Sequence, residues 1–185
     1  MMTQVETLYG PIDAELFERA KQIRLLVCDV DGVLSDGRIY MGNQGEELKT
    51  FHTKDGFGLK ALREIGIEVG IITGRNSRIV SDRMAALGID HVYQGQGDKL
   101  PALQDLLDLL GLDASQTAYI GDDVIDIPVM QACQLGIAVN DAHPLARRAA
   151  DYVTQLDGGA GAVREVCDLL LQANQALDQA QGASI

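Results

Sequence analysis

The stretch from Ile23 to Leu34 constrains the fold of this chain more than any other. Residues 23–28 form a short, mainly apolar run that leads directly into Asp29-Val30-Asp31-Gly32. A continuous apolar run closed by a glycine turn is typical of a parallel β-strand that is covered on both faces. Such sheets bind ligands at the carboxyl ends of their strands, where Asp29 and Asp31 fall. Two acids this close tolerate each other when a cation intervenes or one is protonated, although a plain acidic turn would use the same residues.

Expected strands and helices alternate along the rest of the chain, which predicts an α/β fold with a doubly wound parallel sheet. The expected strands are residues 23–28, 68–72, 91–93, 117–120, 137–139 and 152–154. The expected helices are residues 12–21, 55–65, 77–87, 99–110, 144–150 and 163–176. A β-hairpin insertion is expected at about residues 37–51, and a polar tail at about residues 177–185. The length favours one domain over residues 1–185.

Composition excludes several classes of function. The formal net charge of −12 and the isoelectric point near 4.5 argue against nucleic acid as a partner. No apolar run is long enough to cross a membrane, and the first ten residues lack the features of a signal peptide. Cys28, Cys133 and Cys167 are widely separated among apolar neighbours, which favours reduced, buried thiols. A cytoplasmic location is therefore expected.

Polar residues follow three of the expected strands at the point where each strand ends. They are Asp29 and Asp31, then Thr73-Gly74-Arg75, and finally Gly121-Asp122-Asp123 followed by Asp126. In a doubly wound sheet these strand ends meet over one crevice. The oxygens of Asp29, Asp31 and Asp122 would suit a hard cation, and Mg²⁺ fits best because it needs few protein carboxylates.

This ordered set of motifs, together with Lys99, resembles the haloacid dehalogenase superfamily of phosphotransferases. Residues 37–49, 52–58, 94–95 and 158–170 further resemble the 3-deoxy-D-manno-octulosonate 8-phosphate phosphatases of lipopolysaccharide biosynthesis. The similarity extends from about residue 9 to residue 185. It implies a Rossmann-like enzyme without a cap domain, since the segments between the motifs leave room only for a hairpin and single helices.

The resemblance implies a role for each catalytic residue. Asp29 would be the nucleophile that forms an aspartyl-phosphate, which water then hydrolyses. Asp31 would protonate the leaving alkoxide and later activate the water. Thr73 would donate a hydrogen bond to the phosphoryl oxygens, and Lys99 would offset the negative charge around the nucleophile.

The resemblance also implies the metal and substrate contacts. Mg²⁺ would be held by Asp29, Asp122 and the backbone carbonyl of Asp31, while Asp123 and Asp126 would orient its waters or Lys99. The implied substrate-binding residues are Asp31, His52, Thr53, Lys54, Asp55, Gly56, Lys60, Arg75, Arg83 and Lys99. Arginine suits the phosphate and carboxylate of a phosphorylated sugar acid. The related phosphatases are tetramers joined through the hairpin, so a homotetramer is expected, with some contacts crossing between subunits.

Other functions remain open at this stage. A phosphatase for a nine-carbon deoxy-ulosonate phosphate would carry the same motifs. A catalytically silent oligomerisation module is a second alternative, although intact Asp29, Asp31, Lys99 and Asp122 argue against it. A mutase is disfavoured because it needs a cap to retain its intermediate.

Overall fold

A six-stranded parallel sheet forms the centre of the computed structural model, which describes residues 3–178. Its strands lie in the order β10-β9-β8-β3-β6-β7. They are β3 (Leu25–Cys28), β6 (Glu68–Ile72), β7 (His91–Tyr93), β8 (Thr117–Gly121), β9 (Leu135–Ala138) and β10 (Tyr152–Val153). All five neighbouring pairs are parallel. The predicted doubly wound parallel sheet is confirmed.

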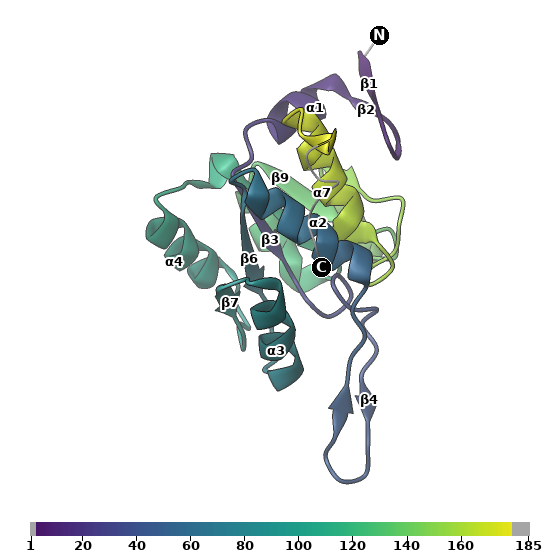
Figure 1. Cartoon of the computed structure of the whole chain (residues 1–185), viewed down its shortest axis with the longest axis vertical. Coiled ribbons are helices and arrows are strands. Elements are labelled where there is room, and N and C mark those ends of the chain that lie inside the picture. The colour runs from purple at the N-terminus through teal and green to yellow at the C-terminus, as the bar shows by residue number, and fades with distance from the viewer. Residues whose placement is uncertain (1–2, 179–185) are drawn as a thin grey trace.

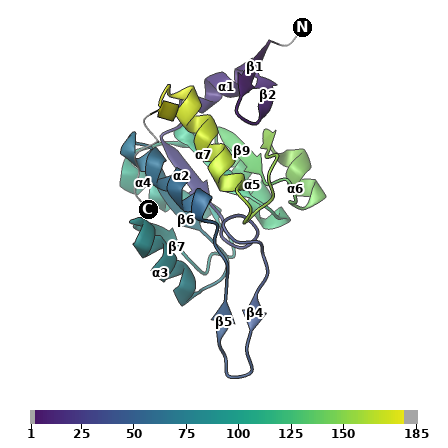
Figure 2. The ribbon, with the colours of Figure 1, turned by 45° about the vertical axis from the view of Figure 1, so that its right-hand side comes forward.

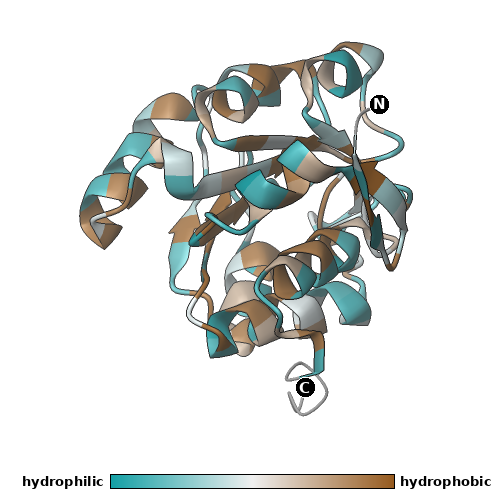
Figure 3. Ribbon diagram, turned by 90° about the horizontal axis from the view of Figure 1, so that it is seen from above, coloured by the Kyte–Doolittle hydropathy of each residue, from teal (hydrophilic) through white to brown (hydrophobic). Residues whose placement is uncertain are grey.

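Helices lie on both sides of this sheet (Figure 3). They are α1 (Ala14–Ala20), α2 (Thr53–Glu64), α3 (Arg78–Leu87), α4 (Leu100–Leu110), α5 (Ile127–Ala132), α6 (Pro144–Ala149) and α7 (Ala162–Ala173), with 3-10 turns η1 (Ala114–Gln116) and η2 (Val124–Asp126). Helices α1 and α2 both pack against α7, whereas α5 packs against α4 and α6. Figure 1 shows α2 and α7 side by side in front of the sheet.

The helix ends follow local sequence signals. Asp13 caps α1 by accepting a hydrogen bond of 2.8 Å from the backbone N–H of Glu15. Gly88 and Gly111 end α3 and α4 with φ angles of 71° and 65°, a left-handed conformation that glycine adopts without strain. These caps agree with the predicted helix boundaries to within a few residues.

The strand order brings the predicted site residues to one edge of the sheet. Strand β3 lies between β8 and β6. The chain adds β6 and β7 on one side of β3, and it later adds β8, β9 and β10 on the other side. Cys28 of β3 is in register with Ile71 and Ile120. The residues that follow these three strands therefore emerge at the same level, at the switch point where doubly wound sheets bind ligands.

The predicted hairpin consists of β4 (Tyr40–Met41) and β5 (Glu47–Leu48), which pair antiparallel. It projects away from the body of the molecule (Figure 2). Each of its strands has two residues. Between Asp31 and the start of β6 the chain forms only this hairpin and α2, so the predicted absence of a cap domain is confirmed. No helix within residues 3–178 has the length and apolar character needed to cross a membrane.

Two strands and one helix, besides the two 3-10 turns, were not predicted from the sequence. The strands β1 (Gln4–Thr7) and β2 (Gly10–Asp13) form a second hairpin, at the opposite end of the molecule from β4 and β5 (Figure 1). The hydroxyl of Tyr9 in its turn donates a hydrogen bond of 2.8 Å to Asp168 of α7. Helix α5 was also missed. Almost all of the expected tail at 177–185 lies outside the described residues.

The contact between α2 and α7 leads to a first prediction. A Cβ atom on Gly58 would lie 2.8 Å from the Cβ atom of Cys167 and 3.0 Å from Arg164. Gly58→Ala should therefore lower the free energy of unfolding by about 1–3 kcal/mol, because overpacking outweighs the better helix propensity of alanine. Urea unfolding would measure this change. Gly97→Ala is the matched control, since a Cβ there meets no atom within 4 Å; equal stability of the two variants would contradict the prediction.

Candidate active site

A polar cleft of about 250 Å³ lies over the carboxyl ends of β3, β6 and β8. Most of the predicted catalytic and metal-binding residues lie together in it. The lining residues are Asp29, Asp31, Gly37, Thr73, Gly74, Arg75, Lys99, Asp122, Asp123 and Ile125. Residues separated by more than ninety positions thus meet in one place because parallel strands deliver them to one edge.

Asp29 and Lys99 form a buried ion pair at the base of the cleft. The Nζ atom of Lys99 lies 2.6 Å from Oδ2 of Asp29, and the two residues are 2% and 6% exposed. Oδ1 of Asp29 accepts a hydrogen bond from the backbone N–H of Val30. Burial raises the pKa of Asp29, and the ammonium of Lys99 opposes this effect. The candidate nucleophile is therefore held in a fixed orientation.

Asp126 holds Lys99 from the other side. Its Oδ1 atom accepts hydrogen bonds from Lys99 at 2.7 Å and from the hydroxyl of Tyr119 at 2.6 Å. Its Oδ2 atom accepts from the backbone N–H groups of Asp122 and Asp123. Both oxygens are thus occupied by protein donors. This geometry supports the predicted role of Asp126 in orienting Lys99.

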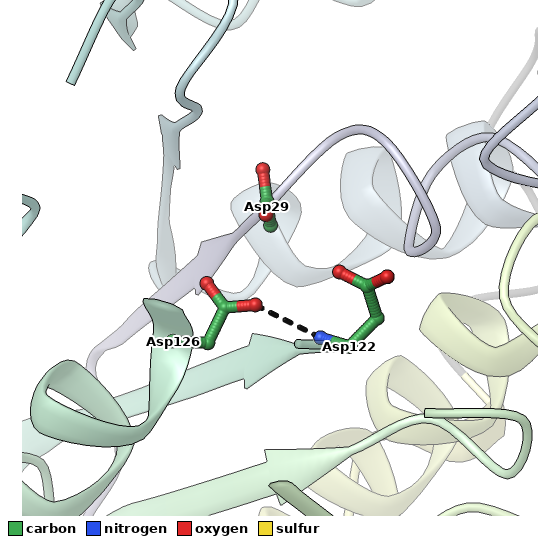
Figure 4. Close-up of side chains that lie close together, drawn as sticks. All are labelled: Asp29, Asp122 and Asp126. Atoms are coloured by element: carbon green, nitrogen blue, oxygen red, sulfur yellow. Dashed lines mark hydrogen bonds between the residues drawn. The ribbon is translucent and has the colours of Figure 1, made fainter. Parts of the chain in front are cut away.

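The carboxylate of Asp122 approaches the turn that follows β3. Asp29, Asp122 and Asp126 form a cluster in which one carboxylate oxygen of each lies within 4.8 Å of the others (Figure 4). A Cβ atom on Gly32, whose φ is +84°, would lie 2.1 Å from Oδ2 of Asp122. Glycine at position 32 is therefore required both for the turn and for the close approach of this carboxylate.

The donor set of the cleft fits a divalent cation. Four carboxylates and two cationic side chains line it, which leaves an excess of two negative charges. Burial, followed by the charges of Asp29, Asp126 and Asp123, raises the pKa of Asp122 from 3.8 to about 8. Carboxylates crowded in this way are stabilised as anions by a hard cation with oxygen ligands, such as Mg²⁺. Asp29 and Asp122 are the side chains placed to hold it.

Asp31 lies at the rim, with its carboxylate turned toward the base of the hairpin. Its Oδ1 atom is 2.5 Å from Nζ of Lys49, and its Oδ2 atom is 3.9 Å from Nε of Arg75. The side chain is therefore not part of the carboxylate cluster. The predicted contact of Asp31 with the metal involves its backbone carbonyl and stays a prediction.

The predicted substrate-binding residues divide into two groups. Asp31, Arg75 and Lys99 line the cleft, whereas His52, Asp55, Gly56 and Arg83 line a separate, small pocket beside the start of α2. Thr53 and Lys54 are exposed nearby, and Lys60 is half-buried on α2. The structure does not bring this second group into the cleft of the same chain.

Asp55 is the buried acid of the second group. Its Oδ1 atom accepts a hydrogen bond from the backbone N–H of Arg164, and its Oδ2 atom has no partner within the described residues. Burial raises the pKa of Asp55 to about 6.

Several residues of the site were not identified from the sequence. Tyr119 supports both Lys99 and Asp126, and the sequence carries no local signal for this role. Glu47 and Lys49 reach the rim of the cleft from the hairpin. Their alternation with Leu48 was a signal that their side chains share one face.

Comparisons with known proteins agree with this geometry. Residues 89–165 match the family described as haloacid dehalogenase-like hydrolase. The protein of Escherichia coli strain K12 named 3-deoxy-D-manno-octulosonate 8-phosphate phosphatase KdsC is 58% identical over 179 residues, 97% of this chain and 95% of the relative. The crystal structure of 3-deoxy-D-manno-octulosonate 8-phosphate phosphatase from Yersinia pestis matches with a TM-score of 0.98 and 55% identity, covering 100% of both chains.

A third relative was solved with ligands. The crystal structure of 3-deoxy-D-manno-octulosonate 8-phosphate phosphatase from Moraxella catarrhalis contains a magnesium ion, a phosphate ion and a KDO molecule. It matches with a TM-score of 0.87 and 47% identity, covering 89% of this chain and 95% of the relative.

The capless fold and the carboxylate-rich cleft define a hydrolase of the haloacid dehalogenase superfamily. The identity to the Escherichia coli relative extends over nearly the whole of both chains. The chain belongs to the 3-deoxy-D-manno-octulosonate 8-phosphate phosphatase family of that superfamily.

The raised pKa of Asp122 predicts how pH affects the metal-free protein. Because the folded pKa of about 8 lies above the ordinary value of 3.8, the folded state binds this proton more tightly than the unfolded state. With EDTA present, the free energy of unfolding should therefore fall as pH rises from about 4 to about 8. Asp122→Asn should raise Tm near pH 8 by about 2–4 °C, the effect of ~1 kcal/mol in a chain of this size.

Thermal scans with EDTA and with Mg²⁺ would check this prediction. Mg²⁺ should raise the Tm of the unaltered protein, because it binds the folded state, and should have little effect on Asp122→Asn. Asp90→Asn is the control, since Asp90 is exposed and does not line the cleft. A lower Tm for metal-free Asp122→Asn near pH 8 would contradict the prediction.

Proposed function

We propose that this chain is a Mg²⁺-dependent phosphatase that hydrolyses 3-deoxy-D-manno-octulosonate 8-phosphate to the free sugar acid and phosphate. The observation that carries the proposal is the cleft in which Asp29, paired with Lys99, lies beside Asp122. The chain carrying this cleft is 58% identical to a phosphatase named for that substrate. The reaction belongs to lipopolysaccharide biosynthesis, as the family resemblance implies.

The proposed reaction has two steps at phosphorus. In the first, a carboxylate oxygen of Asp29 bonds to phosphorus while the bond from phosphorus to the sugar oxygen breaks. The carboxyl group of Asp31 gives its proton to the leaving alkoxide. In the second, water attacks the aspartyl-phosphate, and Asp31 takes the proton that the water loses. As water bonds to phosphorus, the bond between phosphorus and the Asp29 oxygen breaks, which releases phosphate and restores the carboxylate of Asp29.

The surrounding residues reduce the charge repulsion in these steps. Lys99 places a cation 2.6 Å from the carboxylate of Asp29, which would otherwise repel a phosphate dianion. Thr73, which lines the cleft at the end of β6, is the candidate hydrogen-bond donor to the phosphoryl oxygens. When bound by Asp29 and Asp122, Mg²⁺ would supply a Lewis acid that neutralises and aligns the phosphoryl group.

We infer that the second group of substrate-binding residues serves the cleft of a neighbouring copy. His52, Asp55 and Arg83 lie outside the cleft of their own chain. The hairpin supports association of copies, because Tyr40, Met41 and Leu48 are 49%, 78% and 66% exposed. An isolated two-stranded hairpin with such residues needs a partner. A tetramer joined through the hairpins remains the expected assembly.

A cytoplasmic location is part of the same proposal. Cys28, Cys133 and Cys167 are free cysteines, and burial raises the pKa of each thiol. Unpaired, unreactive thiols agree with a reducing compartment.

Release of phosphate from a panel of sugar phosphates would test the reaction. With Mg²⁺, 3-deoxy-D-manno-octulosonate 8-phosphate should be hydrolysed in strong preference to its nine-carbon analogue and to hexose phosphates. Asp29→Asn should reduce turnover to background, because the nucleophile is lost. Asp31→Asn should lower kcat by about 10²–10⁴-fold, the usual contribution of general acid–base catalysis.

Each outcome of this panel has a defined meaning. Preference for the nine-carbon acid would keep the mechanism and change the substrate. Full activity of Asp29→Asn, with circular dichroism unchanged, would refute the assigned nucleophile. No release from any substrate by the folded, metal-loaded protein would favour a silent oligomerisation module.

Substitutions on the apolar face of the hairpin would test the assembly. The double variant Tyr40→Glu and Leu48→Glu changes two residues that lie opposite each other on one face of the hairpin. It should shift the mass in light scattering toward the monomer and lower kcat/KM for the sugar-acid phosphate at least about tenfold. Desolvated charge opposes association, and the neighbouring substrate contacts are then lost. Leu109→Glu is a matched control, because Leu109 on α4 is likewise 66% exposed. An unaltered protein that is already monomeric at working concentration would overturn the proposed assembly.

A further inference from the structure

The rim of the cleft contains a closed ring of four alternating charges. Asp31 pairs with Lys49 at 2.5 Å, Lys49 with Glu47 at 3.8 Å, Glu47 with Arg75 at 3.1 Å, and Arg75 returns to Asp31 at 3.9 Å. The hydroxyl of Ser77 also donates to Glu47 at 3.3 Å. Each acid lies between two cations and each cation between two acids. Isolated surface pairs contribute little to stability, whereas several charges joined in a network can contribute.

Lys49 is the buried member of this ring. Its side chain is 0% exposed, compared with 21% for Asp31, 25% for Glu47 and 48% for Arg75. A buried ammonium is stable only where acceptors compensate for its lost hydration, and here these are Asp31 and Glu47. The shorter of its two contacts is made to Asp31, the residue proposed as general acid and base.

The hairpin directs two kinds of residue to opposite faces. Side chains alternate along a strand, so Glu47 and Lys49 share one face and Leu48 lies on the other. Leu48 is opposite Tyr40 in the register of β4 and β5, and both are exposed. One face of β5 and the residue after it thus carries Glu47 and Lys49 toward the cleft, and the other face carries Leu48, beside Tyr40, into solvent.

We propose that Lys49, supported by Glu47, is a positioning residue that holds the carboxyl group of Asp31 for proton transfer to the leaving alkoxide. Lys49 fixes Oδ1 of Asp31 and leaves Oδ2 on the side of Arg75, another residue that lines the cleft. In the first step this carboxyl loses a proton to the sugar oxygen as the phosphorus–oxygen bond breaks. In the second it regains one from the attacking water. This inference rests on the proposed phosphatase function.

The leaving group of the substrate provides the test. A sugar alkoxide must be protonated as it leaves, whereas the nitrophenolate of p-nitrophenyl phosphate leaves as an anion. The test uses kcat/KM, because it reports the steps up to release of the leaving group and not the later attack of water, which both substrates share. Lys49→Gln should lower kcat/KM for the sugar-acid phosphate about 10–100-fold, as loss of a supporting contact typically does. Its kcat/KM for p-nitrophenyl phosphate should change less than about threefold. Lys21→Gln is the matched control, because Lys21 pairs with Glu18 on α1, outside the cleft.

A double-mutant cycle with Asp31→Asn completes the test. If Lys49 acts through Asp31, adding Lys49→Gln to Asp31→Asn should cause little further loss for the sugar-acid phosphate. Light scattering of each variant would exclude loss of assembly as the cause. Unchanged kinetics of Lys49→Gln, equal losses for both leaving groups, or additive losses in the cycle would each overturn the positioning role. An unaltered protein that hydrolyses neither substrate would instead refute the proposed function.

Discussion

The pairing of Lys99 with Asp29 and Asp126 is the interaction on which the site depends. An ammonium group has three donors, and those of Lys99 contact Asp29, Asp126 and the hydroxyl of Tyr119. Removing one partner of a buried ion pair typically costs about 3–5 kcal/mol, because the other charge is left uncompensated. Burial lowers the pKa of Lys99, but the two carboxylates outweigh burial and raise it. The lysine therefore stays charged and joins the start of α4 to the ends of β3 and β8.

The sheet and the strand-end residues could be predicted because they depend on local signals. Mainly apolar runs such as residues 69–72 of β6 have the length and bounds of buried strands. Glycines such as Gly88 end helices for a local conformational reason. The rule that parallel strands carry ligand residues at their carboxyl ends then placed Asp29, Thr73 and Asp122 together. Their shared cleft confirms that step of the reasoning.

The features that sequence reasoning missed depend on contacts between distant residues. The strands β1 and β2 have little apolar character of their own and are tied to α7 through Tyr9 and Asp168. Helix α5 is a short helix that begins beside Pro128, and periodicity is weak over so few residues. The link from Tyr119 to Lys99 joins positions twenty residues apart. No local pattern distinguishes such a tyrosine from one that only fills the core.

The acidic character of the chain bears on how an anionic substrate is accepted. Both cationic side chains that line the cleft already face carboxylates, Lys99 through Asp29 and Asp126, and Arg75 through Glu47 and Asp31. A phosphate dianion therefore meets no uncompensated protein cation among these lining residues. Since Arg75 is half exposed, it can exchange Glu47 for a substrate carboxylate at low cost, whereas Lys99 is fixed in the interior. The arrangement therefore favours a ligand that carries both a phosphate and a carboxylate and that binds together with a divalent cation. It disfavours a ligand with a phosphate alone.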